Sequence, residues 1–136
     1  MQKPLEGRSF LIVEDDIILA TDLSAALIAA GAKIVLPTVS VSAALSAIGQ
    51  YIFDAVILDV NVRNEWVFPV AHALERSHIP FLFLTAYSKD VIPAEHREKP
   101  LLAKPYTADR LLETLVGVLS PDQETIRLAT RDGQQV

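Results

Sequence analysis

The sequence of 136 residues predicts an α/β fold, in which a doubly wound, five-stranded parallel sheet lies between two layers of helices. The first observation is a series of five short apolar runs without alternating polar residues, which is typical of strands buried on both faces. The second is the helical spacing of apolar residues between these runs. Right-handed crossovers would place the helices on both faces of the sheet.

The predicted strands cover residues 10–13, 34–36, 55–58, 81–84 and 101–103. Apolar stripes with helical spacing lie between residues 19 and 30, 41 and 48, 67 and 74, and 112 and 119. Asp16, Ser40 and Thr107 are candidate N-caps, because short polar side chains bind the free N–H groups of a first helical turn. Gly31 and Gly49 are predicted to end the first two helices.

The connector over residues 88–100 differs from the others. It contains Pro93, several charges and no apolar stripe, so a short or irregular helix is expected there. The helical pattern ends at Ser120-Pro121. We therefore predict one domain over residues 1–120 and a polar tail over residues 121–136, with one helical turn around residues 125–129.

Composition excludes several classes of protein. The net charge of −5 argues against a chain that binds nucleic acid directly, since such proteins carry basic surfaces. No apolar run approaches the roughly 18 residues that a membrane helix needs. The absence of cysteine excludes disulfides and thiolate metal sites, and a cytoplasmic location is expected.

Polar residues collect where four of the predicted strands end. Glu14-Asp15-Asp16 follow the first strand, and Asp59 follows the third, with Asn61 two residues later. Thr85 follows the fourth strand and Lys104-Pro105 follow the fifth. The carboxyl ends of parallel strands meet at one edge of a sheet, where ligands bind. These side chains are therefore expected around a single crevice.

Carboxylates that lie close together repel one another unless a cation shares them, and an all-oxygen cluster suits Mg²⁺. The ion would offset negative charge around a phosphoryl group. Lys104 could pair with one phosphoryl oxygen and Thr85 could donate a hydrogen bond to another. Asp59 would then be the nucleophile that forms an acyl phosphate.

The order of these residues resembles the receiver domains of bacterial two-component response regulators, over residues 8–119. The resemblance implies a flavodoxin-like fold and a phosphoacceptor switch that is not an enzyme. It implies these site residues: Glu14 and Asp15 as the acidic pair for Mg²⁺, Asp59 as phosphoacceptor, Asn61 as donor of a metal-binding carbonyl, Thr85 as switch hydroxyl and Lys104 as phosphate-pairing lysine. It also implies a sensor histidine kinase or phosphotransfer protein as donor, and a downstream protein partner.

Two departures from the common receiver pattern stand out. Leu101 occupies the position of the aromatic switch residue, and residues 62–66 replace the usual loop after the phosphoacceptor. Residues 80–87 resemble a subgroup with a Phe-x-Thr-Gly-Tyr-like motif, often single-domain and paired with histidine kinases of the HWE type. In this subgroup the fourth helix can be poorly formed, and Tyr87 is a candidate for the switch role.

Several alternatives remain open at the level of sequence. A pseudo-receiver would bind partners without phosphorylation, and a haloacid-dehalogenase-like phosphatase would use Asp59 as its nucleophile, although Asn61 replaces the acid/base of that class. Trp66 either packs beside the site or anchors the third helix. The histidines at 72, 78 and 96 are expected in solvent, since their spacing does not suggest a metal site.

Overall fold

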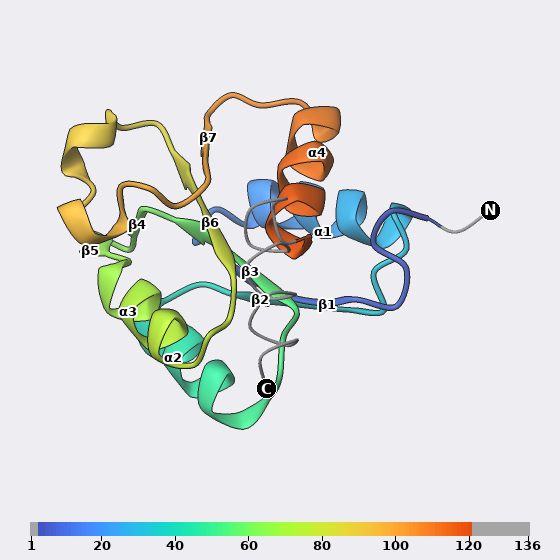
Figure 1. Ribbon diagram of the computed structural model, residues 1–136, viewed down its shortest axis with the longest axis horizontal. Coiled ribbons are helices and arrows are strands. Elements are labelled where there is room, and N and C mark those ends of the chain that lie inside the picture. Colours follow the sequence, from blue (N-terminus) through green and yellow to red (C-terminus); the bar gives the residue numbers. More distant parts are fainter. Residues whose placement is uncertain (1–2, 121–136) are drawn as a thin grey trace, which may run out of the picture.

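The computed structural model describes residues 3–120 and has the predicted fold class. The parallel sheet contains β1 (Ser9–Val13), β2 (Ile34–Thr38), β3 (Ala55–Asp59), β6 (Phe81–Thr85) and β7 (Leu101–Ala103), in the order β2-β1-β3-β6-β7 (Figure 1). This order is that of a flavodoxin-like sheet. All five predicted strands are therefore confirmed.

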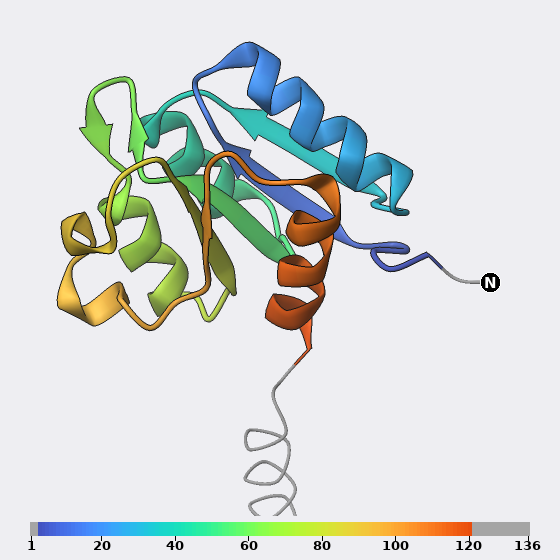
Figure 2. The same ribbon diagram turned by 90° about the horizontal axis from the view of Figure 1, so that it is seen from above.

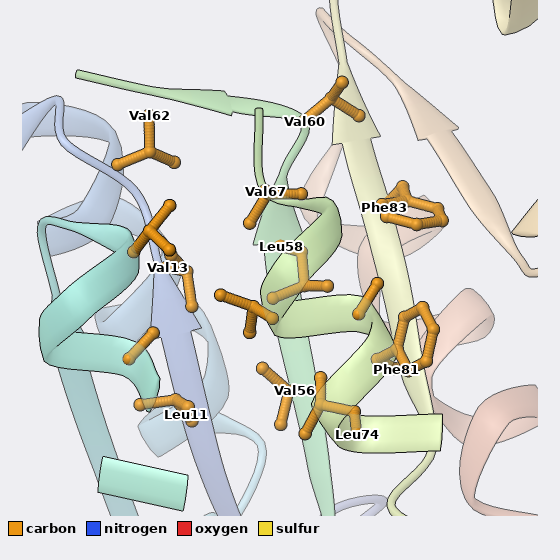
Figure 3. Close-up of a cluster of buried hydrophobic side chains, with 14 of the residues drawn as sticks. Leu11, Val13, Val56, Leu58, Val60, Val62, Val67, Leu74, Phe81 and Phe83 are labelled. Atoms are coloured by element: carbon orange, nitrogen blue, oxygen red, sulfur yellow. The ribbon is translucent and has the colours of Figure 1, made fainter. Parts of the chain in front are cut away.

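Helices cover both faces of the sheet (Figure 2). One face carries α1 (Ile17–Ala29) and α4 (Ala108–Leu119), and the other carries α2 (Val41–Gln50) and α3 (Phe68–Arg76). Successive residues of a strand point to opposite faces, so each central strand divides its side chains between two cores. Leu11, Val56 and Phe83 belong to the core under α2 and α3 (Figure 3), whereas Ile12, Ile57 and Leu84 belong to the core under α1 and α4.

The predicted caps are confirmed. The carboxylate of Asp16 accepts hydrogen bonds from the backbone N–H groups of Ile18 and Leu19, and the hydroxyls of Ser40 and Thr107 cap α2 and α4 in the same way. Gly31 follows α1 with a φ of 107°, a backbone conformation that favours glycine.

The prediction that Gly49 ends the second helix is wrong. The helix continues to Gln50, and the Tyr51 N–H still donates to the Ala47 carbonyl at 2.9 Å. Glycine lowers helix stability by only about 1 kcal/mol, which burial of the other face of α2 outweighs. The extended backbone of Tyr51 ends the helix instead.

The connector between β6 and β7 is irregular, as predicted. It contains two short 3₁₀ turns, η1 (Lys89–Val91) and η2 (Ala94–His96). Ile92 and His96 fasten it to the core under α3. The expectation that His96 lies in solvent is wrong: only 3% of its surface is exposed, because its ring stacks on Phe68 and meets the edges of Phe81 and Phe83.

Strand β2 forms one open edge of the sheet, and its residues are half-buried or exposed. The prediction of burial on both faces is therefore wrong for this strand, which has a neighbour on one side only. The carbonyl of Thr38 accepts a hydrogen bond from the N–H of Glu14. Since the backbone groups of successive residues point to opposite sides of a strand, Pro37 faces the open edge.

A two-stranded hairpin follows β3 and is absent from the prediction. Its strands are β4 (Asn61–Val62) and β5 (Glu65–Trp66), joined by a turn at Arg63 and Asn64 with φ of 50° and 62°. Two successive residues with positive φ are the signature of a tight hairpin turn. The hairpin projects beyond the carboxyl ends of the strands (Figure 2).

The predicted polar tail over residues 121–136, with its helical turn, lies outside the described residues. Among the described helices none combines the length and the apolar character needed to cross a membrane.

Candidate functional site

The structure brings the residues predicted for the site to one end of the sheet. Glu14 follows β1 and is 1% exposed, and Asp59 ends β3 and is 7% exposed. Thr85 ends β6, where it is buried, and Lys104 directly follows β7. Parallel strands deliver these side chains together because their carboxyl ends share one edge.

Lys104 joins the two buried carboxylates. Its Nζ donates to Oδ2 of Asp59 at 2.9 Å and to Oε1 of Glu14 at 3.1 Å. Buried charges need such partners, since the protein interior solvates an isolated ion poorly. The ammonium group therefore offsets part of the negative charge that the strand ends collect.

Burial and charge shift the ionisation of this cluster. Burial, together with the nearby Asp59 carboxylate, raises the pKa of Glu14 from 4.5 to about 7, against the opposing effect of its hydrogen bonds. Burial by itself lowers the pKa of Lys104, but the hydrogen bonds and charges of Asp59 and Glu14 more than reverse this, so that its pKa is raised. Lys104 is therefore a permanent cation at neutral pH.

Three carboxylates could hold a metal ion. One oxygen from each of Glu14, Asp15 and Asp59 lies within 4.8 Å of the other two. Asp15 is exposed, so an ion could reach the group from solvent. A set of carboxylate oxygens with an open side matches the preference of Mg²⁺ for hard oxygen ligands and retained waters. The donor set thus fits the predicted ion.

Asn61 lies beside the same cluster, at the start of β4. Its backbone N–H points to Oδ1 of Asp59 at 3.4 Å. The turn that leaves β3 therefore places the backbone of Asn61 beside Asp59, and the same turn leads into the hairpin.

The hydroxyl of Thr85 is engaged with the backbone of Tyr87. Oγ1 accepts the Tyr87 N–H at 2.8 Å, and the Thr85 carbonyl accepts the Lys104 N–H at 2.9 Å. Tyr87 itself is half exposed, and its ring meets the edge of Trp66. Leu101, at the position where the resemblance expects an aromatic ring, packs against the core under α3.

Trp66 contacts both the third helix, α3, and a residue beside the site, which were the two alternatives left open by the sequence. It stacks on Phe68, the first residue of α3, with ring centroids 5.9 Å apart, and it meets Tyr87 beside the site at 5.6 Å. The backbone N–H of Arg63 donates to Oδ2 of Asp15 at 2.8 Å. The prediction missed this contact, although Asn64, a residue that tolerates positive φ, was a sequence signal for the turn.

An apolar groove of about 540 Å³ runs beside Lys104. Its walls come from α1, through Leu19 and Leu23, and from the segment that enters α4, through Pro105 and Tyr106. Ile17 and Ile18, at the start of the same helix α1, are each more than 70% exposed. Large exposed aliphatic side chains beside a groove are typical of a protein-binding surface.

Solved structures with the same fold include SdrG from Sphingomonas melonis Fr1, which is 35% identical, with 86% of this chain and 98% of that chain covered and a TM-score of 0.69. A protein described as a response regulator from Chloroflexus aurantiacus is 25% identical, with 85% and 100% covered and a TM-score of 0.75. The chain belongs to the response regulator receiver domains. It is thus a component of two-component signalling.

A more distant solved structure shows likeness in fold. The receiver domain of the Francisella response regulator 1452 is 19% identical, with 83% of this chain and 96% of that chain covered and a TM-score of 0.70. No protein-family model matches this receiver domain, and no curated protein matches its sequence.

Proposed function

We propose that this receiver domain accepts a phosphoryl group on Asp59 from a phosphohistidine and switches the binding of a protein partner. The observation that carries the proposal is the position of Asp59, between the Lys104 ammonium and the carboxylates of Glu14 and Asp15. A carboxylate nucleophile is suited to phosphoryl transfer when it lies next to an ammonium group and to carboxylate oxygens that can bind a metal ion.

In the transfer step, a carboxylate oxygen of Asp59 attacks phosphorus and forms an O–P bond. The N–P bond of the phosphohistidine breaks, and its electron pair stays on the imidazole, which takes up a proton from solvent. Mg²⁺, when bound by Glu14, Asp15, Asp59 and the Asn61 carbonyl, supplies positive charge that stabilises the phosphoryl oxygens. Lys104 pairs with another phosphoryl oxygen, since it already donates to Asp59.

Thr85 supplies the switch in this proposal. Its hydroxyl now bonds to the backbone of Tyr87, and a phosphoryl group on the neighbouring strand offers it a stronger acceptor. Movement of Thr85 toward that group would release Tyr87. The two arrangements differ in the surface around Tyr87, which is half exposed and therefore open to a partner.

The proposed donor is a sensor histidine kinase or a phosphotransfer protein. The groove beside Lys104, with the exposed Ile17 and Ile18, would receive apolar side chains of the donor next to Asp59. The resemblance of residues 80–87 to the single-domain subgroup favours a kinase of the HWE type. We further propose that residues 1–120 act as one unit and residues 121–136 as a tail outside it.

Intact mass spectrometry tests the proposal. The protein is incubated with acetyl phosphate, with and without Mg²⁺, as wild type, as Asp59→Asn and as Asp90→Asn. Asp90 is an exposed aspartate outside the pocket, so its substitution is a matched control. We expect one added phosphoryl group on the wild type and on Asp90→Asn, only with Mg²⁺, and none on Asp59→Asn.

A phosphorylated histidine kinase provides a second donor for the same variants. If neither donor labels the wild type in the presence of Mg²⁺, the protein is a pseudo-receiver that binds partners without phosphorylation. Labelling of Asp59→Asn at the wild-type level would place the acceptor elsewhere. Either outcome would overturn the proposal.

A further inference from the structure

The β4–β5 hairpin contacts both sides of the pocket. On one side its turn meets Asp15, and on the other its second strand meets Tyr87. The two contacts are of different kinds, one a hydrogen bond and one a contact between rings. Both come from a single element whose residues lie close together in the sequence.

The contact with Asp15 depends on the conformation of the turn. The donor is the backbone N–H of Arg63, and the distance to Oδ2 of Asp15 is 2.8 Å. This N–H lies in the tight turn in which Arg63 and Asn64 both have positive φ. The side chain of Arg63 is not part of the bond, so another residue that accepts this φ would preserve it.

The contact with Tyr87 reaches the switch hydroxyl. The ring of Trp66 meets that of Tyr87 edge-on, with centroids 5.6 Å apart and an interplanar angle of 66°. The N–H of Tyr87 donates to Thr85 Oγ1 at 2.8 Å. Trp66 therefore contacts Tyr87, the residue whose backbone N–H donates to the Thr85 hydroxyl.

The base of the hairpin is anchored to the core of the domain. Asn61 pairs with Trp66 across the strands, and the Val67 N–H donates to the Val60 carbonyl at 2.9 Å. Val62 points into the core with Val60 and Val67, and none of the three has exposed surface (Figure 3). We expect a hairpin anchored in this way to move as a unit, which would transmit a shift at its turn to Trp66.

We propose that the hairpin couples the two sides of the pocket: through the Arg63 N–H it positions Asp15 for the metal, and through Trp66 it positions Tyr87 and hence Thr85. Arg63 and Trp66 are positioning residues in this view. The inference rests on the proposed function for the metal at Asp15. Partners that orient a metal ligand typically change metal affinity about 10- to 100-fold when they are removed.

Coupling of this kind is reciprocal. If metal binding at Asp15 is coupled to the position of Tyr87, then a substitution at Trp66 that disturbs Tyr87 should also change metal affinity. Trp66 contacts Phe68 and Tyr87 and belongs to neither the acidic cluster nor the Lys104 pair. An effect of Trp66 on Mg²⁺ affinity therefore separates coupling from direct ligation.

The first test uses the wild-type protein and needs no substitution. Mg²⁺ is titrated while the N–H signals of Arg63, Thr85 and Tyr87 and the indole N–H of Trp66 are followed by two-dimensional NMR. We expect all four signals to shift with one common dissociation constant. Shifts confined to Arg63, with Trp66, Tyr87 and Thr85 unchanged at saturation, would overturn the inference.

Two matched pairs of variants form the second test, with Mg²⁺ affinity measured by calorimetry. Arg63→Gly keeps the N–H and accepts positive φ, so it should bind Mg²⁺ within twofold of wild type. Arg63→Pro removes the N–H and excludes that φ, and it should weaken binding about tenfold. Trp66→Phe retains a ring at Tyr87, whereas Trp66→Leu should change the affinity at least threefold.

The inference and the proposed function can fail separately. An unchanged affinity in Trp66→Leu would overturn the coupling even if Asp59 is labelled normally. Shared NMR shifts together with a protein that no donor labels would overturn the phosphoacceptor role and leave the coupling in place. If Arg63→Pro does not fold, the Trp66 pair and the wild-type titration still decide. A wild type that binds no Mg²⁺ would overturn both the coupling and the metal site.

Discussion

Glu14 is the residue of the pocket whose charge depends most on its surroundings. It is 1% exposed, and it shares the Lys104 ammonium with Asp59. Two buried carboxylates and one ammonium leave a surplus of negative charge, so a proton on Glu14 and a metal ion beside it are alternative ways to offset that surplus. The site is therefore sensitive to pH in the absence of metal.

The raised pKa of Glu14 predicts how stability varies with pH in metal-free buffer. Since burial raises this pKa from 4.5 to about 7, the folded protein binds the proton more tightly than the unfolded chain. The contribution to the free energy of unfolding is complete below pH 4.5 and is lost as the pH rises through about 7. The upper bound on this loss is on the order of 3 to 4 kcal/mol, because each tenfold difference in proton affinity between the folded and unfolded states contributes roughly 1.4 kcal/mol.

Urea unfolding at several pH values, with a chelator present, measures this effect. The Glu14→Gln variant has no ionisable group at this position, so its free energy of unfolding should fall less than that of the wild type between pH 5 and 8. The exposed Glu98→Gln is the matched control and should follow the wild type. A Glu14→Gln profile parallel to that of the wild type would contradict the prediction.

At the scale of elements, the five strands of the sheet and the four α-helices were predictable because their signals are local. An apolar run marks a strand, and a polar residue at the head of an apolar stripe marks a helix start, as at Ser40 and Thr107. The strand-end residues of the site followed from the same runs, since parallel strands place their carboxyl ends together.

The hairpin and the burial of His96 were not predictable in this way. The hairpin strands have two residues each, too few for an alternation to be visible. His96 is buried because Phe68, Phe81 and Phe83 converge on it from two other elements. No pattern within the connector reports that tertiary contact.

His96 is predicted to hold the connector between β6 and β7 through its ring. Nδ1 has no hydrogen-bond partner among residues 3–120, so the contribution is mainly apolar contact. His96→Ala should lower the free energy of unfolding by about 2 kcal/mol or more, because it leaves a cavity among the phenylalanines. His96→Phe should be close to neutral, since it removes an unpaired polar atom and keeps the ring.

Urea unfolding compares these variants with His72→Ala, a change at an exposed position of α3 that should stay within about 0.5 kcal/mol of wild type. If His96→Phe proves as costly as His96→Ala, a polar contact of the imidazole holds the connector and the apolar account is wrong.

At the scale of the whole molecule, the pocket lies where the two cores meet across the sheet. Asp59 and Thr85 end strands whose preceding residues divide between both cores, as Leu58 and Ile57 do. A ligand that binds the folded pocket and not the unfolded chain must therefore stabilise the entire domain.

Mg²⁺ is accordingly predicted to raise global stability. At a free concentration 100-fold above its dissociation constant, a ligand of one site adds about 2.7 kcal/mol to the free energy of unfolding. Thermal and urea unfolding should show this gain for the wild type and for Asp90→Asn, and a much smaller gain for Asp15→Asn, which lacks one of the three carboxylates. An equal gain in Asp15→Asn would place the ion elsewhere.

Pro37 has a consequence for the tendency of this domain to aggregate. An open edge strand normally offers a row of free N–H groups to which a foreign strand can attach, and this is how sheets grow into fibrils. Because Pro37 has no N–H and faces that edge, the row lacks a donor at this position. The domain exposes Ile34 and Ile52 at the same end of its sheet, and Pro37 thereby protects it against aggregation through this edge.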